Sequence, residues 1–65
     1  MPSSVIAHMS YDGMKQILTV VFVSGSIYQY LSVPELEYNR MKTAFSKGTY
    51  LNEHIKTKYH FRKVK

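Results

Sequence analysis

Hydrophobic and polar positions alternate along the first half of the chain, which is the pattern of β-strands. After a turn at residues 12–13, residues 16–23 are rich in β-branched side chains and give the strongest predicted strand. A turn at residues 24–25 leads into a third predicted strand over residues 27–31. In the first strand the two alternating rows are Val5, Ala7, Met9 and Tyr11 against Ile6, His8 and Ser10.

The second predicted strand is apolar on both faces, whereas a strand with one solvated face should alternate apolar and polar residues. One row consists of Leu18, Val20 and Phe22, and the other contains Ile17, Val21 and Val23. One layer of helices covers only one face of a sheet, so we expect the second row to contact a partner subunit. The alternative is that a loop or the C-terminal segment covers this row.

Tyr28 and Tyr30 flank Gln29 in the third predicted strand, so their rings share one face. If the preceding turn is a two-residue hairpin, residue 28 faces residue 21, and both tyrosines join the partner-facing row. If a three-residue loop with a bulge forms instead, residue 28 faces residue 20, and the tyrosines lie beneath the helices. We expect half-buried structural residues in both cases, with Tyr28 also a candidate for ligand contact.

A first amphipathic helix is predicted after Pro34, which suits the first turn of a helix. Its expected end lies around residues 46–48, with Gly48, a residue type that commonly terminates helices, as the cap. Leu36 points away from the apolar face and is a further candidate for an oligomer interface. The expected core face consists of Pro34, Tyr38, Met41 and Phe45, with Ala44 beside them.

A second short helix is predicted from Tyr50 to about Thr57, with Thr49 as its capping residue and an apolar stripe of Leu51, Ile55 and Tyr59. The tail after it either pairs as an edge strand or stays loose. The predicted order is therefore β-β-β-α-α. This is one small α+β domain over residues 1–65, with three or four antiparallel strands and two short helices on one face of the sheet.

Composition adds limits to this picture. A chain of 65 residues without cysteine gains little stability from its core and cannot form disulfides, so we expect a homo-oligomer, either a dimer or a tetramer. His8, His54 and His60 lack the close spacing of metal ligands, and no metal site is expected. The sequence has no membrane-spanning run and no signal-peptide pattern at its start, so a cytoplasmic protein is expected.

The chain carries a net charge of +5, and its basic residues gather near the end. From His54 onward it has five lysines and arginines and no acid, namely Lys56, Lys58, Arg62, Lys63 and Lys65. This asymmetry favours a polyanionic partner, either nucleic acid or a phosphorylated small molecule. A solvated basic tail is the alternative interpretation.

No set of acids, histidines or serines has the spacing of a catalytic site, so we expect a binding protein rather than an enzyme, with no cofactor. The best candidate for ligand contact is the segment Ser46, Lys47, Gly48, Thr49 and Tyr50. Hydroxyls, an ammonium group and the start of a helix offer donors to a phosphate there, although ordinary helix capping explains the same residues. Arg40, Asn52 and Lys56 complete the polar candidates, and Tyr50, Tyr11 and Tyr28 are the candidates for base stacking.

Several short motifs occur in a specific order. Their residues are Tyr11, Asp12, Leu18, Val20, Phe22, Gly25, Tyr28, Tyr30, Val33, Pro34, Ala44, Ser46, Gly48, Tyr50, Asn52 and Ile55. This combination, over about residues 8–60, resembles the KTSC domain, a module named from the C-terminus of some lysyl-tRNA synthetases.

The resemblance implies one of two nucleotide-binding roles. The chain is similar to small phage proteins of this kind that assemble as oligomers and sequester cyclic oligonucleotide signals of bacterial antiviral defence. The leading hypothesis is therefore a sponge that binds a cyclic di- or oligonucleotide at a subunit interface. The alternatives are a small RNA-binding module, the original suggestion for this family, and a protein-binding inhibitor that uses the apolar sheet face.

Overall fold

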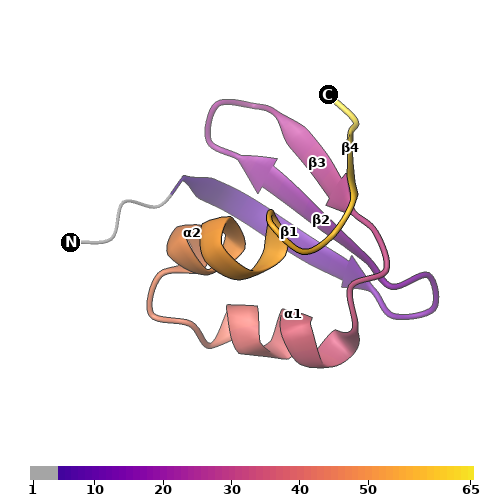
Figure 1. The fold of residues 1–65 in the computed structure, drawn as a ribbon. Helices are drawn as coiled ribbons and strands as arrows, with labels where there is room; N and C mark the ends of the chain where they lie inside the picture. Colours follow the sequence, from indigo (N-terminus) through magenta and orange to yellow (C-terminus); the bar gives the residue numbers. More distant parts are fainter. Residues whose placement is uncertain (1–4) are drawn as a thin grey trace.

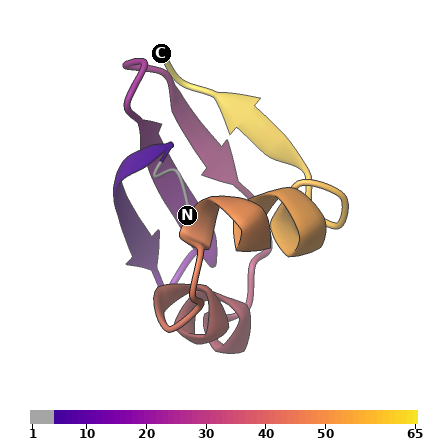
Figure 2. The same cartoon turned by 90° about the vertical axis from the view of Figure 1, so that its left-hand side faces the viewer.

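The computed structural model describes residues 5–65, which form one antiparallel sheet with helices on one of its faces (Figures 1 and 2). The strands follow one another in the sheet in the order β1-β2-β3-β4. This confirms the predicted α+β class, and of the three or four strands expected the sheet has four. The elements are β1 (Ile6–Asp12), β2 (Ile17–Phe22), β3 (Ile27–Tyr30), α1 (Glu35–Lys42), α2 (Lys47–Tyr50), the π-helical turn η1 (Leu51–Ile55) and β4 (Phe61–Lys63).

The hydrophobic core lies between the sheet and the helices. Leu18 and Val20 of β2 point into it, as does Tyr30 of β3, while Met41 comes from α1. Burial of such side chains supplies the main stabilising free energy of a domain this small. The fully or almost fully buried apolar residues are Ile6, Leu18, Val20, Tyr30, Val33, Met41, Leu51 and Ile55.

A β-bulge changes which residues of β1 face the core. The register with β2 shifts between Ile6 and His8, so that Ile6 pairs with Phe22 and His8 pairs with Val21. Simple alternation placed Ile6 in one row with His8 and Ser10, and this prediction was wrong, because Ile6 is buried whereas His8 and Ser10 are exposed. One extra residue in a strand reverses the facing of everything beyond it.

The turn between β2 and β3 is the three-residue loop with a bulge. The Phe22 N–H donates to the Ser26 carbonyl at 2.9 Å, and Gly25 has a φ of 98°. As a result Val20 pairs with Tyr28 and Leu18 pairs with Tyr30. Both tyrosines therefore lie on the core face of the sheet, and the two-residue alternative is excluded.

The boundary between the helices differs from the prediction. Helix α1 ends at Lys42, four residues before the earliest expected end, and Gly48 lies in the first turn of α2 instead of terminating α1. The cap of the second helix is Ser46, whose side chain accepts the Thr49 N–H, so the prediction of Thr49 as the cap was also wrong. The chain leaves the helix before Phe45, which stands 92% exposed and outside the core face predicted for it.

The last segments follow the sequence pattern more closely. Leu51 and Ile55 are buried and Tyr59 is packed against them, which confirms the apolar stripe. The tail pairs with β3 as the edge strand β4, so it is not loose. Within residues 5–65, none of the helices is both long and apolar enough to cross a membrane.

The φ of Gly25 makes a specific prediction about the β2–β3 turn. Gly25→Ala should lower the free energy of unfolding by about 1–2 kcal/mol, because a Cβ is strained at positive φ. The matched control is Gly13→Ala, whose new Cβ would make only an ordinary contact with the Tyr11 ring, at 3.8 Å. Urea denaturation measures both variants, and equal stabilities would contradict the strained turn.

Candidate functional site

A cavity of about 610 Å³ lies at the end of the sheet near the β2–β3 turn. In Figure 2 the strands extend beyond the helices at this end, so part of the core face is not covered by helix. The described residues that line the cavity are Val5, Phe22, Val23, Ser24, Ser26, Tyr28, Tyr30, Lys56 and Phe61. Its volume falls in the range of about 300–1,000 Å³ typical of small-molecule sites.

The aromatic wall of this cavity consists of Tyr28 and the rings of Phe22, Phe61 and Tyr30. The Phe22 ring meets the Tyr28 ring edge to face, with centroids 5.5 Å apart at 88°, and the Phe61 ring lies 5.5 Å away at 49°. Phe61 also contacts the Tyr30 ring at 5.8 Å. Phe61 remains 55% exposed, which leaves a large part of its surface open to a ligand.

Basic residues approach the cavity from two elements. Lys56 follows η1 directly and lines the cavity. Lys63 of β4 pairs with Tyr28, and residues directly opposite each other in antiparallel strands share one face of the sheet. None of the described lining residues is Asp or Glu. The cavity therefore combines apolar aromatic surface with positive charge at its margin.

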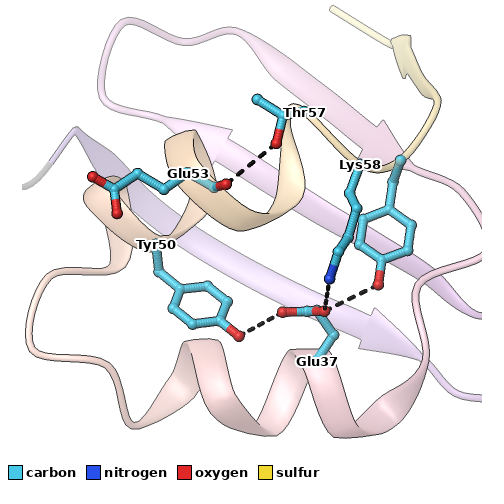
Figure 3. Close-up of polar contacts among 6 residues, drawn as sticks. Glu37, Tyr50, Glu53, Thr57 and Lys58 are labelled. Carbon is cyan, nitrogen blue, oxygen red and sulfur yellow. Dashed lines mark hydrogen bonds and ion pairs between the residues drawn. The ribbon is translucent and has the colours of Figure 1, made fainter.

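The helix that carries Lys56 is held in place by a buried carboxylate, that of Glu37 in α1 (Figure 3). The Tyr50 hydroxyl donates to one Glu37 oxygen at 2.5 Å. The Tyr59 hydroxyl and the Lys58 ammonium reach the other oxygen at 3.0 and 3.5 Å. These contacts tie α1 to Tyr50, in the middle of the α2–η1 segment, and to the turn that follows η1.

The pKa values of this cluster reflect its hydrogen bonds. Burial raises the pKa of Glu37, but the hydrogen bonds from Tyr50 and Tyr59 and the charge of Lys58 outweigh it, so the pKa lies below the ordinary 4.5. The hydrogen bond to Glu37 raises the pKa of Tyr50 above 10.0. Burial, together with the bond to Glu37, does the same for Tyr59. The cluster is therefore most stable with an ionised Glu37 and protonated tyrosines.

The structure brings together two of the sequence-predicted site residues, Tyr28 and Lys56, in the cavity. The other two stacking candidates have structural contacts. The Tyr50 hydroxyl is bound to Glu37, and the Tyr11 hydroxyl donates to the Val33 carbonyl while its ring stacks on Tyr38 at 4.8 Å.

The predicted phosphate segment lies elsewhere, beside a second, shallower groove of about 370 Å³. The Ser46 hydroxyl donates to Thr49 Oγ1 at 3.0 Å and accepts the Thr49 N–H, so the capping interpretation accounts for both residues. Lys47 and Gly48 form the first turn of α2, and Asn52 is exposed on η1. Arg40 lies near the Tyr50 hydroxyl and lowers its pKa slightly. The groove is lined by Ala44, Phe45, Ser46, Thr49, Tyr50, Glu53 and His54.

The four residues predicted for an oligomer interface do not form one surface. Ile17 and Val21 are half-buried on the sheet face away from the helices. Val23 lies in the β2–β3 turn and lines the cavity. Leu36 is exposed on α1, a helix that lies on the core face of the sheet (Figure 2), whereas Ile17 belongs to the other face.

Phe22 and Phe61 line the cavity and Lys63 pairs with Tyr28 beside it, but none of the three was among the sequence-predicted site residues. Phe22 was assigned to the core, and the other two lie in a tail whose pairing was left open. In the sequence, the alternation of Phe61 and Lys63 with Arg62 indicates that Phe61 and Lys63 share one face of a strand. Which face this is follows only from the register with β3. Among residues 5–65, no group of three or more His, Asp or Glu side chains could hold a metal ion.

Comparisons with known proteins agree on a single family. The KTSC domain model matches residues 2–59. A lysine–tRNA ligase of Nostoc punctiforme is 41% identical over 61 residues, which are 94% of this chain and 11% of the ligase. An uncharacterized protein of Stutzerimonas stutzeri is 34% identical over 58 residues, 89% of this chain and 82% of that protein. The chain thus spans about a tenth of the ligase's length.

The fold has a counterpart in a solved structure. The crystal structure of a KTSC domain protein from Yersinia pestis superimposes with a TM-score of 0.88 at 34% sequence identity. The match covers 100% of this chain and 94% of that one. The whole arrangement of sheet and helices is therefore shared.

The Glu37 cluster predicts a pH-dependent loss of stability on mutation. Glu37→Gln should lower the free energy of unfolding by about 2 kcal/mol at pH 7, because hydrogen bonds to a charged acceptor are lost. The lowered pKa means that the carboxylate stabilises the fold above about pH 4.5 and that this contribution disappears as the pH falls through the folded-state value. The difference between wild type and variant should therefore shrink in acid.

Urea denaturation between pH 3 and pH 7 measures this effect, with the pH values chosen to bracket the ordinary carboxyl pKa of about 4.5. Glu35→Gln is the matched control, since Glu35 is an exposed acid in the same helical turn. A Glu37→Gln variant as stable as wild type at pH 7 would contradict the role assigned to the cluster.

Proposed function

We propose that this chain, which belongs to the KTSC domain family, binds nucleotides in its aromatic cavity without changing them chemically. The observation that carries the proposal is the combination of Tyr28, Phe61 and Lys56 at one cavity, with Lys63 opposite Tyr28 in the neighbouring strand. Aromatic rings stack on the faces of bases, and lysine ammonium groups contact phosphates. A ligand with both a planar base and a phosphate satisfies both halves of the site.

The lining also supports binding rather than catalysis. Hydroxyl groups from Ser24, Ser26 and the tyrosines are the other polar groups among the described lining residues, and none of these residues is a histidine or an acid. Such hydroxyls can hydrogen-bond the edge of a base but do not act as a general base at neutral pH without a partner.

The first ligand class is a cyclic oligonucleotide, such as a cyclic dinucleotide. Such a ligand is compact and carries its own phosphates next to its bases, which suits one cavity lined by Lys56, with Lys63 on the neighbouring strand. Binding without turnover would lower the free concentration of a signal in the bacterial cytoplasm, which is the action of a sponge. This assignment rests on the chemistry of the cavity together with the resemblance to phage sponge proteins.

Single-stranded RNA is the second candidate. Strand β4 supplies Arg62 and Lys63, and Lys65 lies two residues beyond it. These three cations could contact successive phosphates of an RNA strand that passes the cavity. Several relatives that share most of this chain are lysine–tRNA ligases. In this case one unstacked base occupies the cavity and the neighbouring phosphates contact the basic strand.

Two substitutions test the cavity directly. Lys56→Gln and Phe61→Ala should each weaken binding of the preferred cyclic oligonucleotide or short RNA about tenfold, because a charged contact or a stacking surface is lost. Isothermal titration calorimetry measures the affinities. Lys15→Gln removes an equal charge from the β1–β2 turn and should bind normally.

The same panel distinguishes the cavity from the segment near Ser46. If Lys47→Gln weakens binding while Lys56→Gln does not, the ligand lies at the start of α2 and the cavity proposal is wrong. If wild type binds none of the cyclic nucleotides and none of the RNAs, nucleotide binding itself is wrong.

Salt dependence separates the two ligand classes. The affinity for RNA should fall steeply between about 50 and 200 mM salt, since each contacted phosphate of a single strand contributes roughly −0.7 to the logarithmic slope. A cyclic dinucleotide has two phosphates, so its slope should stay near roughly −1.4 or shallower. Calorimetry at four salt concentrations gives both slopes, and a steep slope for the preferred ligand would favour RNA.

A further inference from the structure

The two edges of the sheet differ in how well they resist pairing with another strand. Strand β4 forms one edge; it is three residues long and carries Arg62 and Lys63. Strand β1 forms the other edge; it has seven residues and contains no lysine, arginine or proline. Short strands and basic side chains protect an edge, and β1 lacks both protections. Figure 2 shows that no described strand lies beyond β1.

The part of β1 suited to pairing is residues 8–12. The bulge between Ile6 and His8 interrupts the strand, while residues 8–12 keep regular register with β2. In this stretch His8, Ser10 and Asp12 lie on the outer face and are exposed. Met9 and Tyr11 lie on the core face and are half-buried. The available edge is thus five residues long, with Ser10 at its centre.

This five-residue stretch is complementary to itself. In an antiparallel pair centred on Ser10, His8 faces Asp12 of the partner subunit, and Ser10 faces Ser10 of the partner subunit. Met9 then faces Tyr11 of the partner subunit on the core side. The pairs therefore combine an imidazole with a carboxylate, two hydroxyls, and a thioether with an aromatic ring, and each of these is favourable. No two like charges face each other.

We propose that this chain forms a dimer in which β1 strands of two copies pair antiparallel through residues 8–12, giving one continuous eight-stranded sheet. The contact is two-fold symmetric, so each strand satisfies the other and no unprotected long edge remains. The outer edges of the dimer are the two basic β4 strands, which stops further growth. None of the cavity residues takes part, so the dimer and nucleotide binding can be tested separately.

The absence of cysteine makes a crosslinking test specific. Ser10→Cys places the two sulfurs opposite each other at the symmetry axis. The Cα atoms of directly opposite residues in an antiparallel pair lie about 4.5–5.5 Å apart, which falls within the range of about 4.4–6.8 Å that a disulfide needs. Oxidation should convert most of this variant to a covalent dimer at protein concentrations of about 100 µM. Thr57→Cys, an exposed position in the turn after η1 and outside β1, should remain mostly monomeric. Equal crosslinking of the two variants would overturn the proposal.

Charge substitutions at one position test the register. His8→Asp places two carboxylates opposite each other twice in the dimer and should raise the dissociation constant about tenfold. His8→Lys places an ammonium opposite Asp12 of the partner subunit and should leave the dimer as tight as wild type or tighter. Sedimentation velocity from about 10 µM to 1 mM measures both.

A wild-type chain that stays monomeric over this whole range would overturn the dimer. The same result is expected if the natural partner of this edge is an extended segment of a different protein, and the dimer would then also be wrong. Equal dissociation constants for His8→Asp and His8→Lys would overturn the proposed register.

Discussion

The position of the helices depends on one ionised side chain, the carboxylate of Glu37. A charge removed from water is costly unless donors replace its hydration. Here two tyrosine hydroxyls and a lysine supply those donors, and all three come from residues 50–59. The carboxylate thus fixes where the second helical segment lies on the sheet. In a chain of this size, where apolar burial supplies little surplus, such a fixed polar contact has a large share in selecting one packing.

The same constraint determines what remains uncovered. Because Glu37 binds Tyr50 and the turn after η1, the α2–η1 segment stays close to α1 (Figure 3), and the strands extend beyond the helices near the β2–β3 turn (Figure 2). The aromatic residues at that end line the open cavity. Lys56 follows the last residue of η1 and so stands at the margin of this open surface. The structural cluster and the candidate site are therefore linked through one short helical segment, although they share no residue.

The sequence allowed the elements to be predicted better than their boundaries. Alternation and β-branched residues identified three strands, and the stripe of Leu51, Ile55 and Tyr59 identified the second helix. The bulge at Ala7 was not visible, because one inserted residue leaves no mark in a pattern that alternates on both sides of it. Likewise Phe45 suited the helical period, but the chain had already left the helix at Thr43. Tyr28 and Lys56 were predicted as ligand contacts. That they line the same cavity could not be predicted, because it depends on how β3 and the segment after η1 pack together.

The register of β4 has a consequence for the way the cavity could fail. Phe61 and Lys63 face the cavity side, while Arg62 donates to Gln29 at 2.7 Å on the other face. Since side chains alternate along a strand, a slip of one residue would exchange these faces. Phe61 and one cation would leave the cavity side together, and Tyr28 and Tyr30 would lose their ring contacts with Phe61, whereas β2 and the helices would keep their packing. A one-residue change in the register of the three-residue strand β4 would thus abolish the site in a molecule that still appeared folded.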